Sequence, residues 1–583
     1  MLYKKLAELY EKIGSTTKRL EKIDILSKFF EFLSEEDREV IYLLEGNIYP
    51  EYDERRIGIS NQLAIKSISK STGIDAKKVL NEWKKIGDLG EVAKKLTSEK
   101  KQRTLASSVL TTKKVLENLR KLPELEGKGT VDKKISIITE LLTSAEPIEA
   151  LYLTRTLIGD LRIGTQESTI RESLAKAFFK NPKEMSEKIQ GAIDKSNDLA
   201  EVFDACKKKN LKSLEKISLQ VGKPIKAMLA QKAPNIEGGF KALGQPCAIE
   251  YKYDGFRLII HKKNSDIILF TRSLENVTKQ FPEVVEYIKE FVKGSSFILD
   301  SEAVGYDKKT KEYLSFQHIS QRIRRKYHIE ELQKKLPVEI NVFDVLYYNG
   351  KSFLEKPFEE RTKLLRKIII PHPYKIIPSK MIITSDKKEV EKFYNQALKD
   401  NQEGVMMKNL KAPYKPGRRV GNMLKIKPEE KDLDLVITGA EHGKGKRSGW
   451  LSSFILSCKG KKFGEYLEIG KVGTGIVEKE ESKEKNAKVS FSELTEKIKP
   501  LIEKEDGKRV YIKPKIIVAV TYQEIQKSPN YNSGWALRFP RITTLRPDKS
   551  LSEIADLKEI EKDFSNQREI GNMDKSRKNY KLL

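Results

Sequence analysis

Cysteine is scarce in this chain, and long apolar runs are absent. The three cysteines, Cys206, Cys247 and Cys458, are too few and too far apart for a disulfide framework or a four-thiolate zinc site. The N-terminus lacks the apolar core of about 7–15 residues that marks a secretory signal. No apolar run approaches the ~20 residues that span a bilayer. These absences predict a cytoplasmic protein in a reducing compartment, with no membrane segment.

Acidic residues are outnumbered by basic ones. Lys and Arg total 112 against 84 Asp and Glu, which gives a net charge of +28 and a pI near 9.5. Such a balance favours a polyanionic partner, because basic side chains release counterions from phosphates. Nucleic acid is the first candidate and an anionic membrane surface the second. The five histidines show no metal-ligand spacing, so we expect structural or surface roles for them.

The pattern of apolar and polar residues changes twice along the chain, which fits roughly three or four domains. Residues 1–222 space apolar side chains at three and four, which predicts helices. Residues 223–427 alternate short β-rich runs with charged helical segments, which predicts an α/β domain. Residues 428–553 hold short strands between Gly-rich turns, as in a small barrel, and residues 554–583 begin as a helix and end as a tail. The predicted fold is multidomain: α and α/β plus β.

The helical region contains an interruption, "GDLRIGTQESTIRESLAKAF". Gly159 and Gly164 break the helical pattern, and the next helix should start with Thr165 or Ser168 as its N-cap. A helix N-terminus beside Arg162 suits a phosphate. The alternative interpretation is a corner between two helices that binds nothing.

The stretch "YKYDGFR" at 251–257 places a lysine on a predicted strand. Because side chains alternate along a strand, Glu250, Lys252 and Asp254 share one face, and the residues between them pack on the other. By itself this pattern also fits a solvated surface strand. A lysine that acts as a covalent catalyst must be a neutral amine, which neighbouring cations and desolvation favour. Other reactive groups should therefore lie close to Lys252.

Further residues of the right chemistry follow in a fixed order. Carboxylates for Mg²⁺, cations for phosphates and an aromatic ring for a base are the parts that nucleotide transfer needs. Lys425 and Lys427 share a strand face, as do Asp300 and Glu302. Each residue alone fits a solvated charge or ordinary core, whereas their joint order favours nucleotide transfer. The set comprises Arg272, Glu302, Phe343, Glu403, Lys408, Arg419, Lys425 and Lys427.

Through nearly all of its length the chain resembles the ATP-dependent DNA ligases, particularly the archaeal replicative type. "YKYDGFR" is similar to the motif that holds the adenylated lysine of the nucleotidyltransferase superfamily. The resemblance thus implies that Lys252 is the nucleophile. It also implies that Glu250 binds adenine and that Phe343 stacks on it. Glu302 would bind ribose and metal, and Glu403 would lie on the metal side. Basic residues would contact the rest of the nucleotide: Arg257 and Arg272 the ribose or phosphate, and Arg419, Lys425 and Lys427 the phosphates.

The flanking segments resemble ligase domains as well. "GDLRIGTQESTIRESLAKAF" is similar to part of the helical DNA-binding domain, which implies DNA contacts at Arg162 and Gly164. "GKPIKAMLA" is similar to the entry of the adenylation domain. "SGWALRFPRITTLRPDK" is similar to the motif that closes the OB-fold, which implies that Arg538, Arg541, Asp548 and Lys549 face pyrophosphate. The implied domains are a DNA-binding domain (1–222), an adenylation domain (223–427), an OB-fold (428–553) and a C-terminal helix and tail (554–583).

Three positions depart from the family pattern. Met423 stands where Trp is usual before "LKIK", Ser273 where Asn usually follows the arginine, and Ala519 where an acidic residue is common. A flexible thioether can fill the same apolar gap as Trp, so we expect altered packing at Met423 and retained chemistry.

The resemblance also implies a mechanism and partners. AMP passes from ATP to the lysine, then to a 5′ phosphate, and leaves when the 3′ hydroxyl attacks, with Mg²⁺ or alternatively Mn²⁺ as the metal. The partner is nicked double-stranded DNA, and we expect a monomer. The segment Gln102 to Ser108, "QRTLASS", half resembles a peptide that binds a sliding clamp, although Ala106 and Ser107 replace its usual aromatics.

Several other functions fit parts of the same sequence pattern. An RNA ligase or an mRNA capping enzyme would also adenylate or guanylate a lysine, but the long helical front end and "LRPDK" favour a DNA ligase. The missing cysteine quartet disfavours an NAD⁺-dependent ligase. The intact reactive set argues against a non-catalytic DNA clamp. In "GAEHGKGKRSG", Lys444 replaces the second glycine of a P-loop, so a basic turn is expected there.

Overall fold

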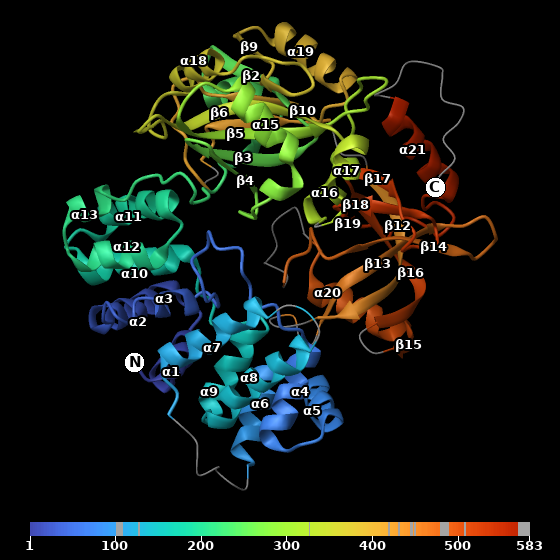
Figure 1. The fold of residues 1–583 in the computed structure, drawn as a ribbon. Helices are drawn as coiled ribbons and strands as arrows, with labels where there is room; N and C mark the ends of the chain where they lie inside the picture. The colour runs from blue at the N-terminus through green and yellow to red at the C-terminus, as the bar shows by residue number, and fades with distance from the viewer. Residues whose placement is uncertain are drawn as a thin grey trace. The chain divides into compact units, whose positions relative to one another are not determined.

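The computed structural model describes residues 1–100, 109–125, 127, 129–325, 327–417, 420–428, 432–443, 447, 450–478, 489–506 and 509–569. The chain divides into two compact units, Met1–Lys427 and Pro428–Leu583. The first unit holds a helical region followed by an α/β region, and the second unit is rich in strands (Figure 1). Within the described residues no helix is long and apolar enough to cross a membrane.

A single apolar core runs through the helical region. Helix amphipathicity builds it: the first helix, for example, buries Leu6, Tyr10 and Ile13, which recur at three and four. The helices are α1 (Tyr3–Gly14), α2 (Arg19–Phe32), α3 (Val40–Leu43), α4 (Asn61–Thr72), α5 (Ala76–Ile86), α6 (Leu89–Ser98), α7 (Thr112–Glu124), α8 (Thr130–Ser144), α9 (Pro147–Leu157), α10 (Glu167–Phe178), α11 (Pro182–Ser196), α12 (Leu199–Lys207) and α13 (Leu211–Glu215).

The predicted N-cap of α10 is wrong. The cap is Gln166, whose side chain makes no capping hydrogen bond, and Ser168 already lies inside the helix. The left-handed turn at Gly164 leaves Thr165 and Gln166 before the helix begins. Glu167 in the first turn supplies the negative charge that a helix N-terminus favours.

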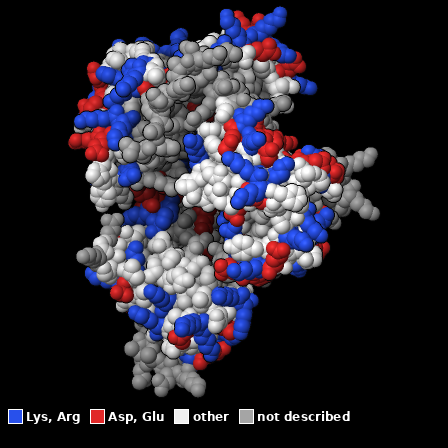
Figure 2. Space-filling view, turned by 90° about the vertical axis from the view of Figure 1, so that its right-hand side faces the viewer, with Lys and Arg blue, Asp and Glu red and all other residues white. Residues whose placement is uncertain are grey.

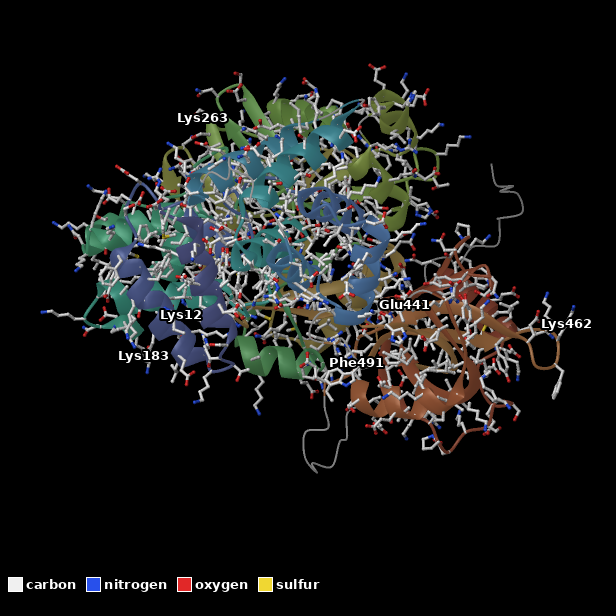
Figure 3. The ribbon with its side chains drawn as sticks, turned by 90° about the horizontal axis from the view of Figure 1, so that it is seen from below. Lys12, Lys183, Lys263, Glu441, Lys462 and Phe491 are labelled. Carbon is white, nitrogen blue, oxygen red and sulfur yellow. The ribbon has the colours of Figure 1, made fainter. Side chains whose placement is uncertain are left out.

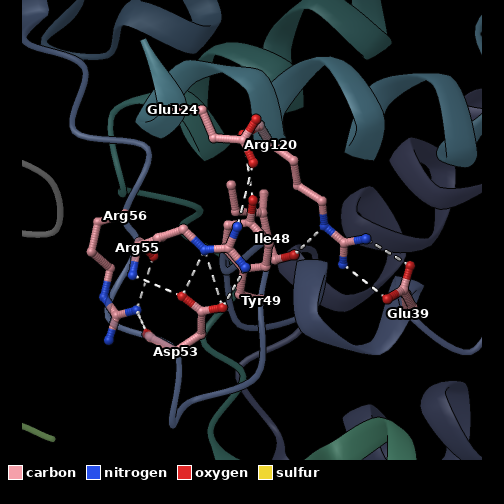
Figure 4. A network of polar contacts seen from close by, with 8 residues as sticks. All are labelled: Glu39, Ile48, Tyr49, Asp53, Arg55, Arg56, Arg120 and Glu124. Carbon is pink, nitrogen blue, oxygen red and sulfur yellow. Dashed lines mark hydrogen bonds and ion pairs between the residues drawn. The ribbon is translucent and has the colours of Figure 1, made fainter. Parts of the chain in front are cut away.

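The loop between α3 and α4 is braced by charges around one aromatic ring (Figure 4). The Tyr49 ring centroid lies 3.9 Å from the guanidinium carbon of Arg55 and 5.0 Å from that of Arg120. Asp53 accepts hydrogen bonds from Arg55, and Glu39 accepts two from Arg120 at 2.8 and 3.0 Å. Cation–π contacts and forked ion pairs together fix the loop.

Two carboxylates of this braced loop contact the α/β region, and its Tyr52 ring centroid lies 5.3 Å from Lys223 Nζ. Glu51 Oε2 lies 2.6 Å from Lys226 Nζ. Glu54 Oε2 accepts a hydrogen bond of 3.0 Å from the backbone N–H of Asn276. Asn276 closes the turn that carries Arg272.

Two sheets form the α/β region, in the orders β1-β11-β10-β2-β9 and β4-β3-β5-β6-β7, with β8 beside β6. The elements are β1 (Gln231–Lys232), α14 (Ile236–Leu243), β2 (Cys247–Lys252), β3 (Phe256–Lys263), β4 (Asp266–Thr271), η1 (Thr278–Gln280), α15 (Pro282–Phe291), β5 (Ser296–Gly305), α16 (Phe316–Arg324), α17 (Ile329–Lys335), β6 (Val338–Tyr348), β7 (Lys351–Ser352), α18 (Phe358–Ile368), β8 (Ile376–Pro378), β9 (Met381–Thr384), α19 (Lys387–Lys399), β10 (Gly404–Lys408) and β11 (Met423–Ile426).

Alternation along β2 and β3 sorts their side chains between different cores. Ile249 and Tyr251 of β2 pack in one cluster with residues of α14 and α19. Leu258 of β3 packs with residues of α15 and α18, whereas Ile259 packs with Met423 of β11 in a cluster that both sheets share. The faces that carry Glu250 and Arg257 are therefore opposite to the helix-covered faces.

The second unit is built on a sheet of order β14-β13-β12-β16-β15, with β19 beside β16. Figure 3 shows Lys462 on the loop between β13 and β14, which extends away from these strands. The expected order of a helical, an α/β and a strand-rich region is confirmed. The elements of this unit are β12 (Asp432–His442), β13 (Leu451–Lys459), β14 (Tyr466–Val472), α20 (Phe491–Ile498), η3 (Lys499–Leu501), β15 (Ile502–Asp506), β16 (Arg509–Thr521), β17 (Glu524–Lys527), β18 (Trp535–Arg538), β19 (Arg541–Leu545) and α21 (Leu557–Glu569).

Candidate active site

Lys252 ends strand β2 beside the start of β10, where it meets a carboxylate. Its Nζ lies 2.9 Å from Glu403 Oε2, and Lys427 Nζ contacts the same oxygen. The backbone N–H of Glu403 donates to the carbonyl of Lys252 over 2.9 Å. Pairing of neighbouring strands thus fixes the amine and the carboxylate together.

We expected neighbouring cations to surround the amine of Lys252, but the structure places a carboxylate in direct contact with it. Burial favours the neutral form of Glu403, yet Lys252 and Lys427 outweigh it and hold the pKa of this carboxyl below its usual value. Glu403 is therefore ionised at neutral pH, and two lysines share its charge.

A second carboxyl, Glu302 of β5, lies in the same electrostatic field. It pairs across the sheet with Arg257 of β3. Burial raises its pKa to about 7, against the lowering effects of Lys252 and Arg257, and Glu403 adds to the rise. Glu302 thus titrates near neutral pH, and its proton depends on the charges around Lys252.

The third part of the site is an aromatic ring held beside cations. Phe343 is the extra residue of a bulge between β5 and β6, where Ser301 pairs with Val342 and Asp300 pairs with Asp344. A bulge of this kind redirects a side chain. The ring centroid of Phe343 lies 4.9 Å from the Arg257 guanidinium and 4.9 Å from the Lys408 ammonium.

Lys408 also forms a buried ion pair with Glu250. Their Nζ and Oε2 atoms are 2.5 Å apart, and the side chains are 6% and 3% exposed. The two residues lie on one face because Ala248 of β2 pairs with Lys408 and Glu250 pairs with Met406. The Lys408 ammonium therefore lies close to both the Glu250 carboxylate and the Phe343 ring. The sequence motif contains Lys408, but the resemblance gave it no role.

Arg257 is fixed by a network of groups that the sequence revealed only in part. Its Nε donates to Asp300 Oδ1 over 2.7 Å, and the second fork of the guanidinium contacts Asp300 Oδ2. Tyr414 donates its hydroxyl proton to the same carboxylate over 2.7 Å, while its oxygen accepts from the backbone N–H of Met228. The sequence indicated only that Asp300 and Glu302, two positions apart on one strand, share a face. Nothing in it predicted the role of Tyr414.

The glycine of "KYDG" is required by a close approach of backbone. A Cβ on Gly255 would lie 2.3 Å from the carbonyl oxygen of Ala303 and 2.9 Å from Cγ of Glu302. Only glycine fits at this distance, and it keeps Lys252 beside the strand that carries Glu302.

The remaining predicted residues of the first unit are placed differently. Lys425 of β11 pairs with Met406, which pairs with Glu250, so Lys425 shares their sheet face. Arg272 is exposed in the turn after β4. Arg419 lies outside the described residues.

In the helical region, the side chain of Arg162 contacts Asp88 and Asp160, and Gly164 adopts a left-handed conformation with φ 63°. On the face drawn in Figure 2, basic side chains lie among acidic ones.

Predicted residues of the second unit lie on its strands and on the segment after them. Lys549 Nζ is 2.6 Å from Asp434 Oδ2, and Arg546 contacts the same carboxylate. Arg538 Nη1 lies 2.7 Å from Glu524 Oε1 on the neighbouring strand, and Arg541 is exposed.

Glu302 and Glu403 fit a divalent cation. Hard cations such as Mg²⁺ are bound by one or two carboxylates together with water and substrate phosphates. Both side chains are only partly exposed and interact with each other electrostatically. Among the residues that the structure describes, no three metal-binding side chains cluster. The chain would thus supply part of the coordination, which suits a metal shared with phosphates.

Comparisons with known proteins cover almost the whole chain. Three family models match it: DNA ligase N terminus over residues 2–175, ATP dependent DNA ligase domain over 227–427, and ATP dependent DNA ligase C terminal region over 447–549. The DNA ligase of Nanoarchaeum equitans (strain Kin4-M) is 45% identical over 568 residues, which cover 97% of this chain and 99% of the relative. The DNA ligase of Methanocaldococcus jannaschii is 38% identical over 589 residues, which cover 97% and 100%.

One solved structure, Pmar-Lig_PreS3, is similar in fold. Its TM-score is 0.57 at 17% sequence identity, with 93% of this chain and 99% of that chain covered. The fold, the arrangement around Lys252 and matches to three successive ligase regions agree, and we conclude that this chain belongs to the ATP-dependent DNA ligases.

Proposed function

We propose that this ligase seals nicks in duplex DNA, with Lys252 as its nucleophile. Lys252 Nζ attacks the α-phosphate of ATP, and a nitrogen–phosphorus bond forms as the bond to pyrophosphate breaks. AMP then passes to the 5′ phosphate of the nick, and the 3′ hydroxyl attacks that phosphate and expels AMP. The observation that carries this proposal is the contact of Lys252 with Glu403, beside Lys427 and Glu302.

The side chains around Lys252 orient the nucleotide. The ion pair with Glu403 opens and the ammonium loses its proton before the attack, because only a neutral amine is nucleophilic. Phe343 stacks on adenine, and Glu250 binds the edge of the base. Arg257, Arg272, Arg419, Lys425 and Lys427 contact ribose and phosphates, while Arg538, Arg541 and Lys549 face pyrophosphate. Positioning and charge neutralisation of this kind supply most of the catalysis in phosphoryl transfer.

The metal in this proposal is Mg²⁺, with Mn²⁺ as an alternative. Glu302 and Glu403 are the side chains that would hold it. When bound, it neutralises charge on the phosphates.

The partner is nicked double-stranded DNA, with Arg162 and Gly164 in the DNA-facing part of the helical region. The net charge of +28 supports broad contact with a phosphate backbone. The enzyme acts as a monomer in the cytoplasm, at the nucleoid, in replication, repair and recombination. The proposed domains end at residues 222, 427 and 553. The segment Gln102 to Ser108, a candidate for binding a sliding clamp, lies outside the described residues.

The test is transfer of label from ATP to the protein. Wild-type protein incubated with α-labelled ATP and Mg²⁺ should form a labelled adduct that survives denaturation, and added nicked DNA should discharge it into sealed product. Lys252→Ala should form no adduct. Lys263→Ala, an exposed lysine at the end of β3, is the matched control and should behave as wild type. An adduct on Lys252→Ala would overturn the assignment.

A further inference from the structure

Asp88 is a buried carboxylate that joins three parts of the helical region. It is 5% exposed and caps α6, where its Oδ1 accepts from the backbone N–H groups of Gly90 and Glu91 over 2.8 and 3.3 Å. Its Oδ2 lies 2.8 Å from Arg155 Nη2 of α9 and 2.9 Å from Arg162 Nη1. Burial favours the neutral acid, yet the two arginines outweigh it and keep the pKa of Asp88 below its usual value.

Arg162, the predicted phosphate contact, turns its side chain into the protein. All three guanidinium nitrogens have partners: Nη1 contacts Asp88, Nε donates to Asp160 Oδ2 over 2.8 Å, and Nη2 donates to the Gly87 carbonyl over 3.3 Å. The backbone of Arg162 is left-handed, with φ 59°. A guanidinium needs free, paired N–H groups to bind a phosphate with two hydrogen bonds. Each nitrogen of Arg162 already uses one N–H within the protein, so its Nε edge is taken and at most the second N–H groups of Nη1 and Nη2 are left for a phosphate.

A second charged side chain holds the other edge of the same turn. Lys22 of α2, only 8% exposed, donates its Nζ to the carbonyl of Ile163 over 2.5 Å and lies 3.4 Å from that of Gly164. A Cβ on Gly164 would lie 2.7 Å from this amine. Gly159 and Gly164 stay exposed, both left-handed. The turn is thus braced from inside: its two exposed residues, Gly159 and Gly164, present only backbone to solvent, and the partly exposed Asp160 carboxylate is engaged by Arg162.

We infer that Asp88 is a positioning residue for the DNA-facing turn 159–164, and that it acts through Arg162, which shapes the turn and binds no phosphate itself. The inference rests on the proposed function, which puts this turn against nicked DNA. Backbone N–H groups contact phosphates without any charged side chain. The N–H groups of Gly159 and Asp160 are already bonded to carbonyls of α9, so the groups in question are those of residues 161–164. With three left-handed residues in the turn, they stay aligned only while its braces hold.

The alternative, a direct phosphate contact by Arg162, predicts effects of opposite sign. Asp88 would then compete with DNA for the guanidinium, and Asp88→Asn would tighten binding. Arg162→Ala would remove one phosphate contact, which lowers the slope of log K against log salt concentration by about 0.9. According to our inference, Asp88→Asn weakens binding and Arg162→Ala leaves the slope unchanged.

The experiment is a titration of fluorescent nicked duplex with the full chain at several salt concentrations. Asp88→Asn and Arg162→Ala should each bind roughly tenfold more weakly than wild type, as expected from losing charged hydrogen bonds. Both should keep the wild-type salt slope. Asp75→Asn is the matched control, since Asp75 caps α5 through the N–H of Lys77 just as Asp88 caps α6. It removes the same charge from a helix N-cap while the amide oxygen keeps the capping hydrogen bond, and should bind within about twofold of wild type.

Each outcome decides a different claim. Binding of Asp88→Asn that equals or exceeds wild type, or a slope reduced by about one in Arg162→Ala, overturns the inference. Failure of the wild type to bind nicked duplex overturns the proposed function as well. If circular dichroism shows that Asp88→Asn does not fold, the slope of Arg162→Ala decides alone.

Discussion

Replacing Glu302 with Gln should stabilise the α/β region at alkaline pH and leave it unchanged at acidic pH. The carboxyl has a pKa of about 7 in the folded protein and 4.5 as an isolated group. Between these values the folded protein keeps a proton that the unfolded chain has lost. The free energy of unfolding therefore falls as pH rises through this window, and the loss is complete above pH 7. Gln has no such titration.

The size of the effect follows from the two pKa values. One pH unit corresponds to about 1.4 kcal/mol, so the full difference amounts to about 3 kcal/mol. Solvent around the partly exposed side chain reduces it, and we expect about 2 kcal/mol at pH 8.5. The pKa already includes the favourable effects of Lys252 and Arg257. Loss of those two interactions in the variant therefore needs no separate correction.

Local hydrogen exchange is the assay that isolates this region. The three tryptophans, Trp83, Trp450 and Trp535, lie outside residues 223–427, so their fluorescence would report on other parts of the chain. Peptides that cover β5 contain backbone amides that are hydrogen-bonded to β3 and β6. At pH 8.5, without metal, their exchange should be about 30-fold slower in Glu302→Gln than in wild type, which corresponds to ~2 kcal/mol.

The comparison is made between the two proteins at each pH, so the intrinsic pH dependence of exchange cancels. Their exchange rates should agree below about pH 4 and separate between about pH 4.5 and pH 7. Equal rates at every pH, or a constant ratio, would refute the conclusion that ionising the partly buried Glu302 costs stability.

Three further outcomes follow from the structure. Gly255→Ala should lower the rate of Lys252 adenylation at least about tenfold without changing the circular dichroism, since a Cβ would meet the Ala303 carbonyl; a normal rate would contradict the close approach. Burial lowers the pKa of His261 to about 3 from 6.5, so below pH 6.5 the unfolded chain gains a proton that the folded chain lacks. In urea unfolding, His261→Asn should then lose about 2 kcal/mol less than wild type between pH 7 and pH 5, and equal losses would exclude a neutral buried ring. Affinity for nicked DNA should fall steeply with salt, and a flat response would exclude broad phosphate contact.

Strand periodicity predicted part of the site from the sequence. It placed Glu250 and Lys252 on one face, and the packing of Ile249 and Tyr251 in the opposite core confirms it. Register across strands was beyond reach, because it depends on pairing partners far away in the chain. The bulge at Phe343 is an example: it exists only because β5 and β6 slip by one residue.

Long-range charge pairs were also hidden in the sequence. Asp88 and Arg162 are 74 positions apart, and neither belongs to a pattern that would predict their contact. The N-cap of α10 failed for a related reason: a left-handed Gly164 moved the start of the helix past Thr165. Local propensity cannot report a backbone shape that distant side chains hold in place.

The hydrogen bond from the Glu403 backbone to Lys252 has an evolutionary consequence. A single inserted residue within either strand would turn each following side chain to the reverse side of the sheet. Insertions elsewhere between positions 252 and 403 would leave the pair untouched. We therefore expect ligases of different lengths to vary freely in the loops between these two strands, while the short intervals 250 to 252 and 403 to 408 are inherited without gaps.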